Sequence, residues 1–186
     1  ATPPSDRITM AGIGVGRQGG GDLRQFMRHP DVRVVAICDV QDTARERVKT
    51  AVDRQYKDTA CVAYNDFREI TRRSDIDAIL CATPDHCHAW VTVAALRRGK
   101  HVYCEKPLTH SIYEARRITQ AARQAKVATQ MGNQGHSGEH VRLLCEWIWQ
   151  GSLGDVTEAH VRPPFNQMDF GSRGPGRPIP VPPGFD

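Results

Sequence analysis

The stretch ITMAGIGVGRQG (residues 8–19) decides the fold, because it joins a short apolar strand to a glycine-rich turn and the start of a helix. Its glycines follow the pattern G-x-G-x-x-G at Gly14, Gly16 and Gly19. The first glycine permits a tight turn, the second lets the backbone approach a pyrophosphate, and the third lets the helix pack closely on the strand. The free N–H groups and partial positive charge of a helix N-terminus attract phosphate. The stretch therefore predicts a dinucleotide-binding turn.

An aspartate stands where the second strand of such a unit would end. Asp39 lies twenty residues beyond Gly19, directly after the apolar run Val32–Cys38. A carboxylate there accepts hydrogen bonds from the ribose hydroxyls of adenosine and repels a 2′-phosphate. The turn and Asp39 therefore predict a site that prefers NAD over NADP, with Arg17 and Gln18 as further cofactor-binding residues. The alternative is an aspartate that only caps the end of the strand and needs no ligand.

Short β-branched runs alternate with longer helical patterns along the first 150 residues. We expect strands at 8–13, 32–38, 62–64, 76–82, 101–104 and 127–131, and helices at 19–29, 42–54, 67–73, 89–98, 111–125 and 136–150. Asp66 is the expected N-cap of the third helix, and Ser111 with Glu114 forms an expected capping box. This alternation indicates βαβ units and a parallel sheet. The predicted fold class is α/β, a doubly wound parallel-sheet Rossmann domain over residues 7–135.

The rest of the chain predicts the start of an incomplete second domain. Residues 136–162 are expected to hold a connecting helix and, at Val156–Val161, the first strand of an α+β C-terminal domain. Seven prolines with interleaved glycines then predict an irregular segment over 163–186. Residues 1–6 are expected to form a short tail. We therefore expect the chain to be the N-terminal half of a longer protein.

Composition is that of an ordinary globular protein, with 39% hydrophobic and 25% charged residues and a net charge of +4 over 186 residues. Basic and acidic residues are mixed, so no nucleic-acid partner is expected. No apolar run is long enough to span a membrane, and the start lacks a secretory signal. The cysteines Cys38, Cys81 and Cys104 are expected to be buried strand thiols, and the run Arg97–Lys100 a solvated helix end. Localisation stays open between the cytoplasm and export after removal of a leader.

Four stretches of the chain resemble the Gfo/Idh/MocA oxidoreductases, the family of glucose–fructose oxidoreductase and inositol dehydrogenase. They are Ala11–Gly19, Asp77–His88, Gly99–Leu108 and Gln130–His136, within a resemblance that covers about residues 7–162. The tripeptide Glu105-Lys106-Pro107 is the most specific feature. The resemblance implies an NAD-dependent sugar or polyol dehydrogenase, which transfers a hydride between a secondary alcohol of a sugar or cyclitol and NAD.

The same resemblance implies roles for individual residues near the nicotinamide. Ala82, Thr83, Pro84 and His88 would border that end of the cofactor. Lys106 would lie between nicotinamide and substrate, with its ammonium bonded to a sugar hydroxyl.

Three further residues complete the predicted site. Glu105 would contact the cofactor ribose or hold the neighbouring lysine, and Asn133 and His136 would line the rim of the substrate pocket. Pro107 is expected to follow a cis peptide, because such bonds occur in tight strand-end turns.

Two other functions stay open, namely an NAD-dependent glycosidase that works by oxidation and elimination, and a non-catalytic NAD-binding module. No metal site is expected, because the run Asp85–His88 has no second pair of ligands elsewhere in the sequence. The resemblance implies a homo-oligomer for the full-length form. As it stands, the chain is expected to bind NAD but to turn over sugars slowly or not at all, since it lacks walls that exclude water.

Overall fold

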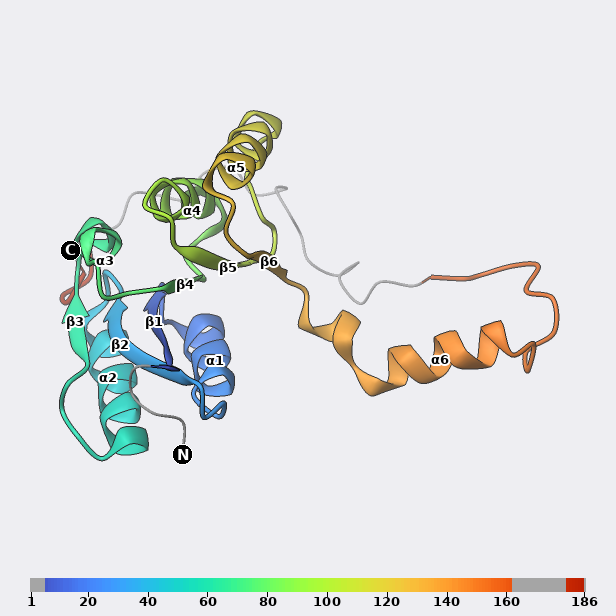
Figure 1. The fold of residues 1–186 in the computed structure, drawn as a ribbon, viewed down its shortest axis with the longest axis horizontal. Coiled ribbons are helices and arrows are strands. Elements are labelled where there is room, and N and C mark those ends of the chain that lie inside the picture. Colours follow the sequence, from blue (N-terminus) through green and yellow to red (C-terminus); the bar gives the residue numbers. More distant parts are fainter. Residues whose placement is uncertain (1–5, 162–179, 186) are drawn as a thin grey trace. The chain divides into compact units, whose positions relative to one another are not determined.

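The computed structural model describes residues 6–161 and 180–185 of the 186-residue chain (Figure 1). The contacts divide it into two units. The first holds the described residues up to Gly132 together with Pro183–Phe185, and the second begins at Asn133. Most of the predicted tail at 1–6 and of the irregular segment at 163–186 lies outside the described residues. No described helix is both long and apolar enough to cross a membrane.

The first unit is built on one parallel sheet of six strands in the order β3-β2-β1-β4-β5-β6. The strands are β1 (Ile8–Ile13), β2 (Val32–Cys38), β3 (Val62–Tyr64), β4 (Ala78–Cys81), β5 (His101–Glu105) and β6 (Thr129–Gly132). The central strands are apolar on both faces because helices cover both faces, as is usual for parallel sheets. The chain runs outward from β1 to β3, returns to β4 and continues to β6. This confirms the predicted doubly wound α/β fold.

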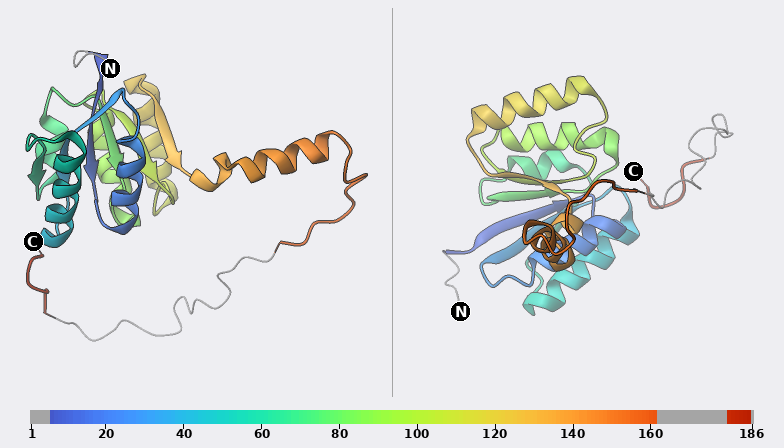
Figure 2. Two further views of the ribbon diagram at one scale, coloured as in Figure 1. Left: turned by 90° about the horizontal axis from the view of Figure 1, so that it is seen from below. Right: turned by 90° about the vertical axis from the view of Figure 1, so that its right-hand side faces the viewer.

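Helices cover the two faces of this sheet in two groups (Figure 2). Their bounds are α1 (Arg17–Phe26), α2 (Asp42–Tyr56), α3 (Phe67–Arg72), α4 (His88–Leu96) and α5 (Ile112–Ala125). One apolar cluster joins α1 and α2 to the sheet through Leu23, Val48 and Val52. The other joins α3, α4 and α5 to the opposite face through Ile70, Leu96 and Ile118. Both faces of the sheet are therefore buried.

The predicted helix starts are confirmed where a polar side chain marks them. The Asp66 carboxylate accepts a hydrogen bond from the Arg68 backbone N–H at 2.8 Å. Ser111 accepts from the Glu114 backbone N–H at 3.3 Å, and the Glu114 carboxylate accepts from the Ser111 N–H at 3.0 Å. Both are N-caps that satisfy donors left free by the helix geometry.

Two predictions about the structure are wrong. Val156–Val161 forms no strand, because a strand needs a hydrogen-bonded neighbour and no described residue pairs with this segment. Lys100, expected at a solvated helix end, is only 4% exposed. Its ammonium donates to the Arg73 and Ile76 carbonyls at 2.6 and 2.7 Å, and these bonds compensate for its burial.

The second unit carries a short 3₁₀ turn, Gln134–Ser137, and helix α6 (Glu139–Trp149). The helix begins three residues later than predicted, because this turn occupies its expected first residues. Its apolar side chains, Trp147 among them at 50%, are partly exposed, and α6 buries no residue among those described.

We expect Ser111→Ala to lower the free energy of unfolding by about 1 kcal/mol, because α5 loses the side-chain acceptor at its N-terminus. Urea denaturation followed by circular dichroism measures the change. Ser74→Ala, at an exposed turn position that caps no helix, is the matched control and should leave stability unchanged. Equal stabilities of the two variants would contradict the role of the capping box.

Candidate cofactor and active site

The predicted site residues gather where the carboxyl ends of β1, β2, β4 and β5 meet. The strand order reverses between β1 and β4, which is the position where doubly wound sheets bind their ligands. Backbone bonds tie these ends together, with the Gly14 N–H donating to the Cys38 carbonyl at 2.8 Å and the Ala82 N–H to the Ile13 carbonyl at 2.9 Å. The glycine turn, Asp39 and the Ala82–Pro84 loop therefore share one edge of the sheet.

Gly14 and Gly19 stand where backbones approach too closely for side chains. Gly14 has φ +78°, and a Cβ there would lie 2.6 Å from the Ala82 carbonyl and from the Thr83 nitrogen. A Cβ on Gly19 would overlap the Gly14 carbonyl oxygen and lie 2.9 Å from the Ala82 Cβ. The turn is thus packed between the α1 helix and the end of β4, and both positions require glycine.

Gly16, in contrast, faces open space, since a Cβ there would meet no heavy atom within 4 Å. The α1 helix begins directly after it, with no side-chain cap and no acidic residue in its first turn. Arg17 and Gln18 are exposed there. An uncapped helix N-terminus beside an open glycine is a suitable place for a pyrophosphate, so the residues present fit the phosphates of a dinucleotide.

Asp39 follows β2 as predicted and is half-buried. Its Oδ1 accepts a hydrogen bond from the Gln41 backbone N–H at 3.0 Å, so the carboxylate caps the local turn. A carboxylate has about four acceptor positions, which leaves capacity for ribose hydroxyls as well. Its charge also acts on Cys38 beside it, whose pKa is raised to about 12, first by burial and then by the Asp39 charge.

The end of β5 carries the Glu105-Lys106-Pro107 turn. Glu105 is 4% exposed, and its carboxylate accepts a hydrogen bond from the Lys106 backbone N–H at 3.4 Å. The Lys106 side chain is exposed, while the Lys106–Pro107 peptide is cis, which confirms the prediction for this bond. Tyr103 lies two residues before Glu105 on the same strand. Burial raises the pKa of its hydroxyl, and the charges of Glu105 and Asp22 raise it further.

His88 holds this turn from inside the protein. It is the first residue of α4 and is 1% exposed, and its Nδ1 lies 2.6 Å from the Pro107 carbonyl oxygen. The sequence places His88 at the border of the nicotinamide, whereas the structure shows it buried and bonded to the turn that precedes Leu108. His88 therefore contacts the predicted site through its hydrogen bond to Pro107.

Two cysteines outside the predicted site lie beside His88. Cys81 and Cys104 are register partners on β4 and β5, and their thiols and one ring nitrogen of His88 all lie within 4.8 Å of one another. A hydrogen bond from Cys104 lowers the pKa of Cys81 to about 7, and the same interaction with burial raises that of Cys104. Strand register brings these residues together, which no local pattern in the sequence shows.

The remaining predicted residues, Asn133 and His136, are exposed and belong to the second unit. Asn133 follows Gly132, which pairs with Glu105 in the sheet. Their place at the rim of a substrate pocket stays a prediction.

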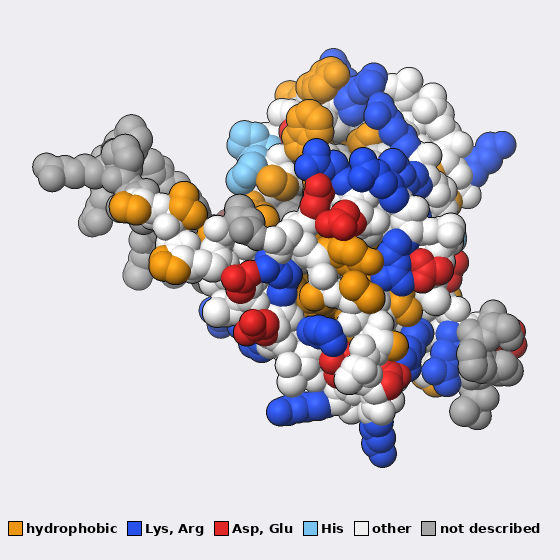
Figure 3. All heavy atoms as spheres, turned by 90° about the vertical axis from the view of Figure 1, so that its left-hand side faces the viewer, with side chains coloured by type: hydrophobic (Ala, Val, Ile, Leu, Met, Phe, Trp, Pro, Cys, Tyr) orange, Lys and Arg blue, Asp and Glu red, His pale blue; other side chains and the backbone are white. Residues whose placement is uncertain are grey.

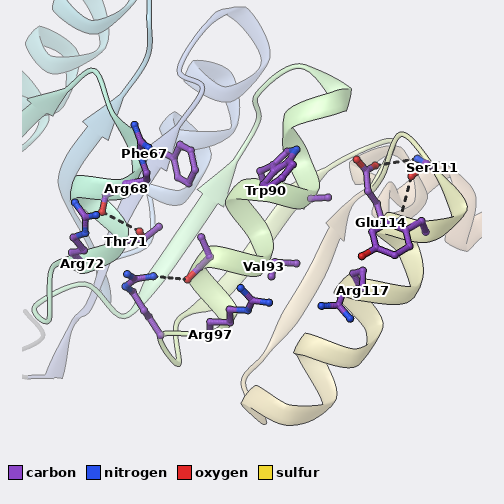
Figure 4. Close-up of a pocket in the computed structure, with 14 residues that line it drawn as sticks. Phe67, Arg68, Thr71, Arg72, Trp90, Val93, Arg97, Ser111, Glu114 and Arg117 are labelled. Carbon is purple, nitrogen blue, oxygen red and sulfur yellow. Dashed lines mark hydrogen bonds between the residues drawn. The ribbon is translucent and has the colours of Figure 1, made fainter.

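A separate groove of about 530 Å³ lies between α3, α4 and α5 (Figure 4). Its lining is mostly apolar, with Phe67, Trp90 and Val93 among its residues and Arg97 and Arg117 beside them. It includes no residue of the glycine turn or of Glu105–Pro107. A space-filling view of one face shows basic side chains intermixed with acidic and hydrophobic ones (Figure 3).

The chain matches known proteins over the same region. A family model described as "Oxidoreductase family, NAD-binding Rossmann fold" covers residues 8–133. A curated relative, a glycosyl hydrolase family 109 protein from Shewanella putrefaciens, is 27% identical over 157 residues, which are 83% of this chain and 34% of the relative. The chain therefore spans about a third of the length of that relative.

Solved structures share the fold. An NAD-binding oxidoreductase from Klebsiella pneumoniae is 28% identical with a TM-score of 0.66, over 80% of this chain and 40% of the other. A scyllo-inositol dehydrogenase from Lactobacillus casei, solved with NAD(H) and scyllo-inositol, is 24% identical with a TM-score of 0.72, over 81% of this chain and 43% of the other.

The matched family and the glycine turn agree on the cofactor, which is NAD. The chain belongs to the Gfo/Idh/MocA oxidoreductase family, whose NAD-binding Rossmann domain it carries.

Proposed function

We propose that this chain is the cofactor-binding part of an NAD-dependent dehydrogenase that oxidises a secondary alcohol of a sugar or cyclitol. The observation that carries the proposal is the exposed Lys106, which follows β5 on the same sheet edge as the glycine turn. The buried Glu105 and His88 hold the turn that presents it. An ammonium carried by this turn suits a hydroxyl-bearing substrate placed beside the cofactor.

Oxidation of such an alcohol breaks a C–H and an O–H bond, and the bound NAD supplies the carbon that accepts the hydride. The Lys106 ammonium has only donors, so it bonds the substrate hydroxyl oxygen and stabilises the negative charge that develops there. It does not itself take the hydroxyl proton while charged, so a separate base completes the reaction. The chain's own contribution is to position the alcohol and to stabilise its oxygen.

Asp39 and Glu105 would serve the cofactor in different ways. The Asp39 carboxylate, fixed by the Gln41 N–H, would accept bonds from the adenosine ribose. Glu105 would contact the second ribose or hold Lys106, and its bond from the Lys106 N–H favours the second role. Ala82, Thr83 and Pro84 would border the nicotinamide, next to the turn that Gly14 forms.

An NAD-dependent glycosidase is the second candidate, and the names of the curated relatives favour it. In that reaction the same hydride step is transient: it acidifies a neighbouring C–H, and the glycosidic bond leaves by elimination. The products distinguish the two functions. A dehydrogenase accumulates NADH. A glycosidase returns the hydride to the sugar, so it accumulates no NADH, and it cleaves a chromogenic glycoside only when NAD is present. A non-catalytic NAD-binding module would do neither.

We expect Gly16→Ala to weaken NAD binding at least about tenfold while leaving the melting temperature unchanged, because the added methyl enters the open space proposed for the pyrophosphate. Isothermal titration calorimetry and thermal unfolding measure the two effects. Gly21→Ala, on the outside of α1, is the matched control and should leave the NAD affinity unchanged, while its melting temperature should not fall, because alanine favours a helix interior. Gly19→Ala should instead destabilise the fold. Unchanged NAD affinity in folded Gly16→Ala would contradict the phosphate site.

We expect the chain to bind NAD at least about tenfold more tightly than NADP, because the Asp39 carboxylate repels a 2′-phosphate. Asp39→Ala removes charged hydrogen bonds worth about 1.5–3 kcal/mol, so NAD affinity should fall about 10–100-fold and the preference should shrink. Asp31→Ala, at the other end of β2, is the control. Titration of both nucleotides decides the matter, and tighter NADP binding by the unchanged chain would refute the assignment.

We expect the chain, supplied with NAD and a panel of inositols and sugars, to produce NADH far below the usual enzymatic rates of about 1–10³ s⁻¹. The physical reason is that Lys106 is open to solvent, so water competes for its ammonium. Absorbance of NADH gives the rate. Lys106→Ala should lower the residual rate further, and Lys126→Ala, at a surface position after α5, should not. Turnover at ordinary rates would contradict this expectation.

A further inference from the structure

The cluster of Cys81, His88 and Cys104 plays no part in the proposed reaction. The three side chains are 0%, 1% and 1% exposed, and their ligand atoms all lie within 4.8 Å of one another. Cys81 and Cys104 face the same side of the sheet because they are register partners on neighbouring parallel strands. His88 reaches them from α4, which packs on that face. Three elements thus bring two thiols and an imidazole together.

The hydrogen bonds of His88 leave one ring nitrogen available to a ligand. The Pro107 carbonyl only accepts, so Nδ1 is protonated and donates to it at 2.6 Å. In the neutral tautomer with a proton on Nδ1, Nε2 carries the lone pair; this atom is buried with no hydrogen-bond partner among the described residues. A histidine whose other nitrogen donates to a backbone carbonyl is the usual arrangement of a metal ligand.

Thr92 lies on the same helix as His88. It follows His88 by four residues, so both lie on one face of α4, and its hydroxyl hydrogen-bonds Cys104. Buried polar groups normally have partners, so the unpartnered His88 Nε2 in a cluster with two thiols points to a missing ligand.

We propose that Cys81, His88 and Cys104 bind a thiophilic divalent metal ion of the zinc class. Thiolate and imidazole select such an ion over magnesium or calcium, which prefer oxygen ligands. Two thiolates balance a 2+ charge, so the buried site is neutral, whereas a monovalent ion would leave a net charge there. Binding releases two thiol protons to solvent and changes no oxidation state.

The geometry requires only a small contraction. Zinc lies about 2.3 Å from sulfur and about 2.0–2.1 Å from nitrogen in tetrahedral sites, so its ligands stand roughly 3.5–4 Å apart. The present separations of up to 4.8 Å would therefore shrink by roughly 1.3 Å at most. Three protein ligands leave one position of a tetrahedral ion to a further ligand.

Such an ion would lie behind the proposed active site without touching the substrate. Cys104 directly precedes Glu105, and His88 bonds the Pro107 carbonyl, so two of the three ligands flank the Glu105-Lys106-Pro107 turn. The ion would fix this turn relative to β4 and α4. This is a positioning role, and it does not depend on the proposed reaction.

The test is a titration of the reduced full chain with Co²⁺ in the absence of NAD, so its result is independent of the proposed function. We expect one equivalent to bind, with a sulfur-to-cobalt charge-transfer band and the strong visible bands of tetrahedral cobalt, both removed by Zn²⁺. Cys81→Ser, Cys104→Ser and His88→Gln should each weaken binding at least about 100-fold, since loss of a second-shell partner alone costs about 10–100-fold. Cys87→Ser, at a half-buried thiol outside the cluster, is the matched control and should bind normally.

The unchanged chain decides the question even if a variant fails to fold. Absence of the cobalt bands in the reduced chain would overturn the proposal. So would cobalt binding that survives loss of both thiols.

Discussion

The glycine turn depends on the absence of side chains at two positions where the β1–α1 connection meets the end of β4. Gly14 packs closely on the Ala82 carbonyl and the Thr83 nitrogen, and Gly19 packs closely on the Gly14 carbonyl. This contact brings α1 onto the sheet beside β4, the point where the strand order reverses. It therefore fixes the helix N-terminus, the loop after β4 and, through strand pairing, the end of β5 in one arrangement. A methyl group at either glycine would separate these parts.

Much of this arrangement could be predicted from the sequence because it is encoded locally. Apolar runs indicate strands buried on both faces, and Asp66 or Ser111 marks a helix start through a bond to a nearby N–H. Strand and helix bounds accordingly agree within a few residues. The glycine spacing and Asp39 also indicated the cofactor, since each requirement lies within a short stretch of chain.

The features that the sequence did not predict depend on residues that are distant in the chain. Lys100 stands in a sequence typical of an exposed helix end. Its ammonium nevertheless donates hydrogen bonds to two carbonyls of the segment before β4, and these bonds permit its burial. Val156–Val161 has the composition of a strand but no described neighbour to pair with. The convergence of Cys81, Cys104 and His88 follows from the register of β4 with β5, which the sequence does not show. Local patterns predict elements, whereas contacts across the sheet decide burial and side-chain partners.

The order of the strands also sets the length of ligand that this edge accommodates. Asp39 follows β2 and Lys106 follows β5, and β1 and β4 lie between these two strands. Three strand spacings of about 4.8 Å separate the two ends by roughly 14 Å. In the proposed site, a dinucleotide with its adenosine ribose at Asp39 and its nicotinamide near the turn that carries Lys106 would therefore lie extended across the sheet. A mononucleotide would reach only one of them, so the covalent link between the two halves contributes affinity by making the second contact intramolecular.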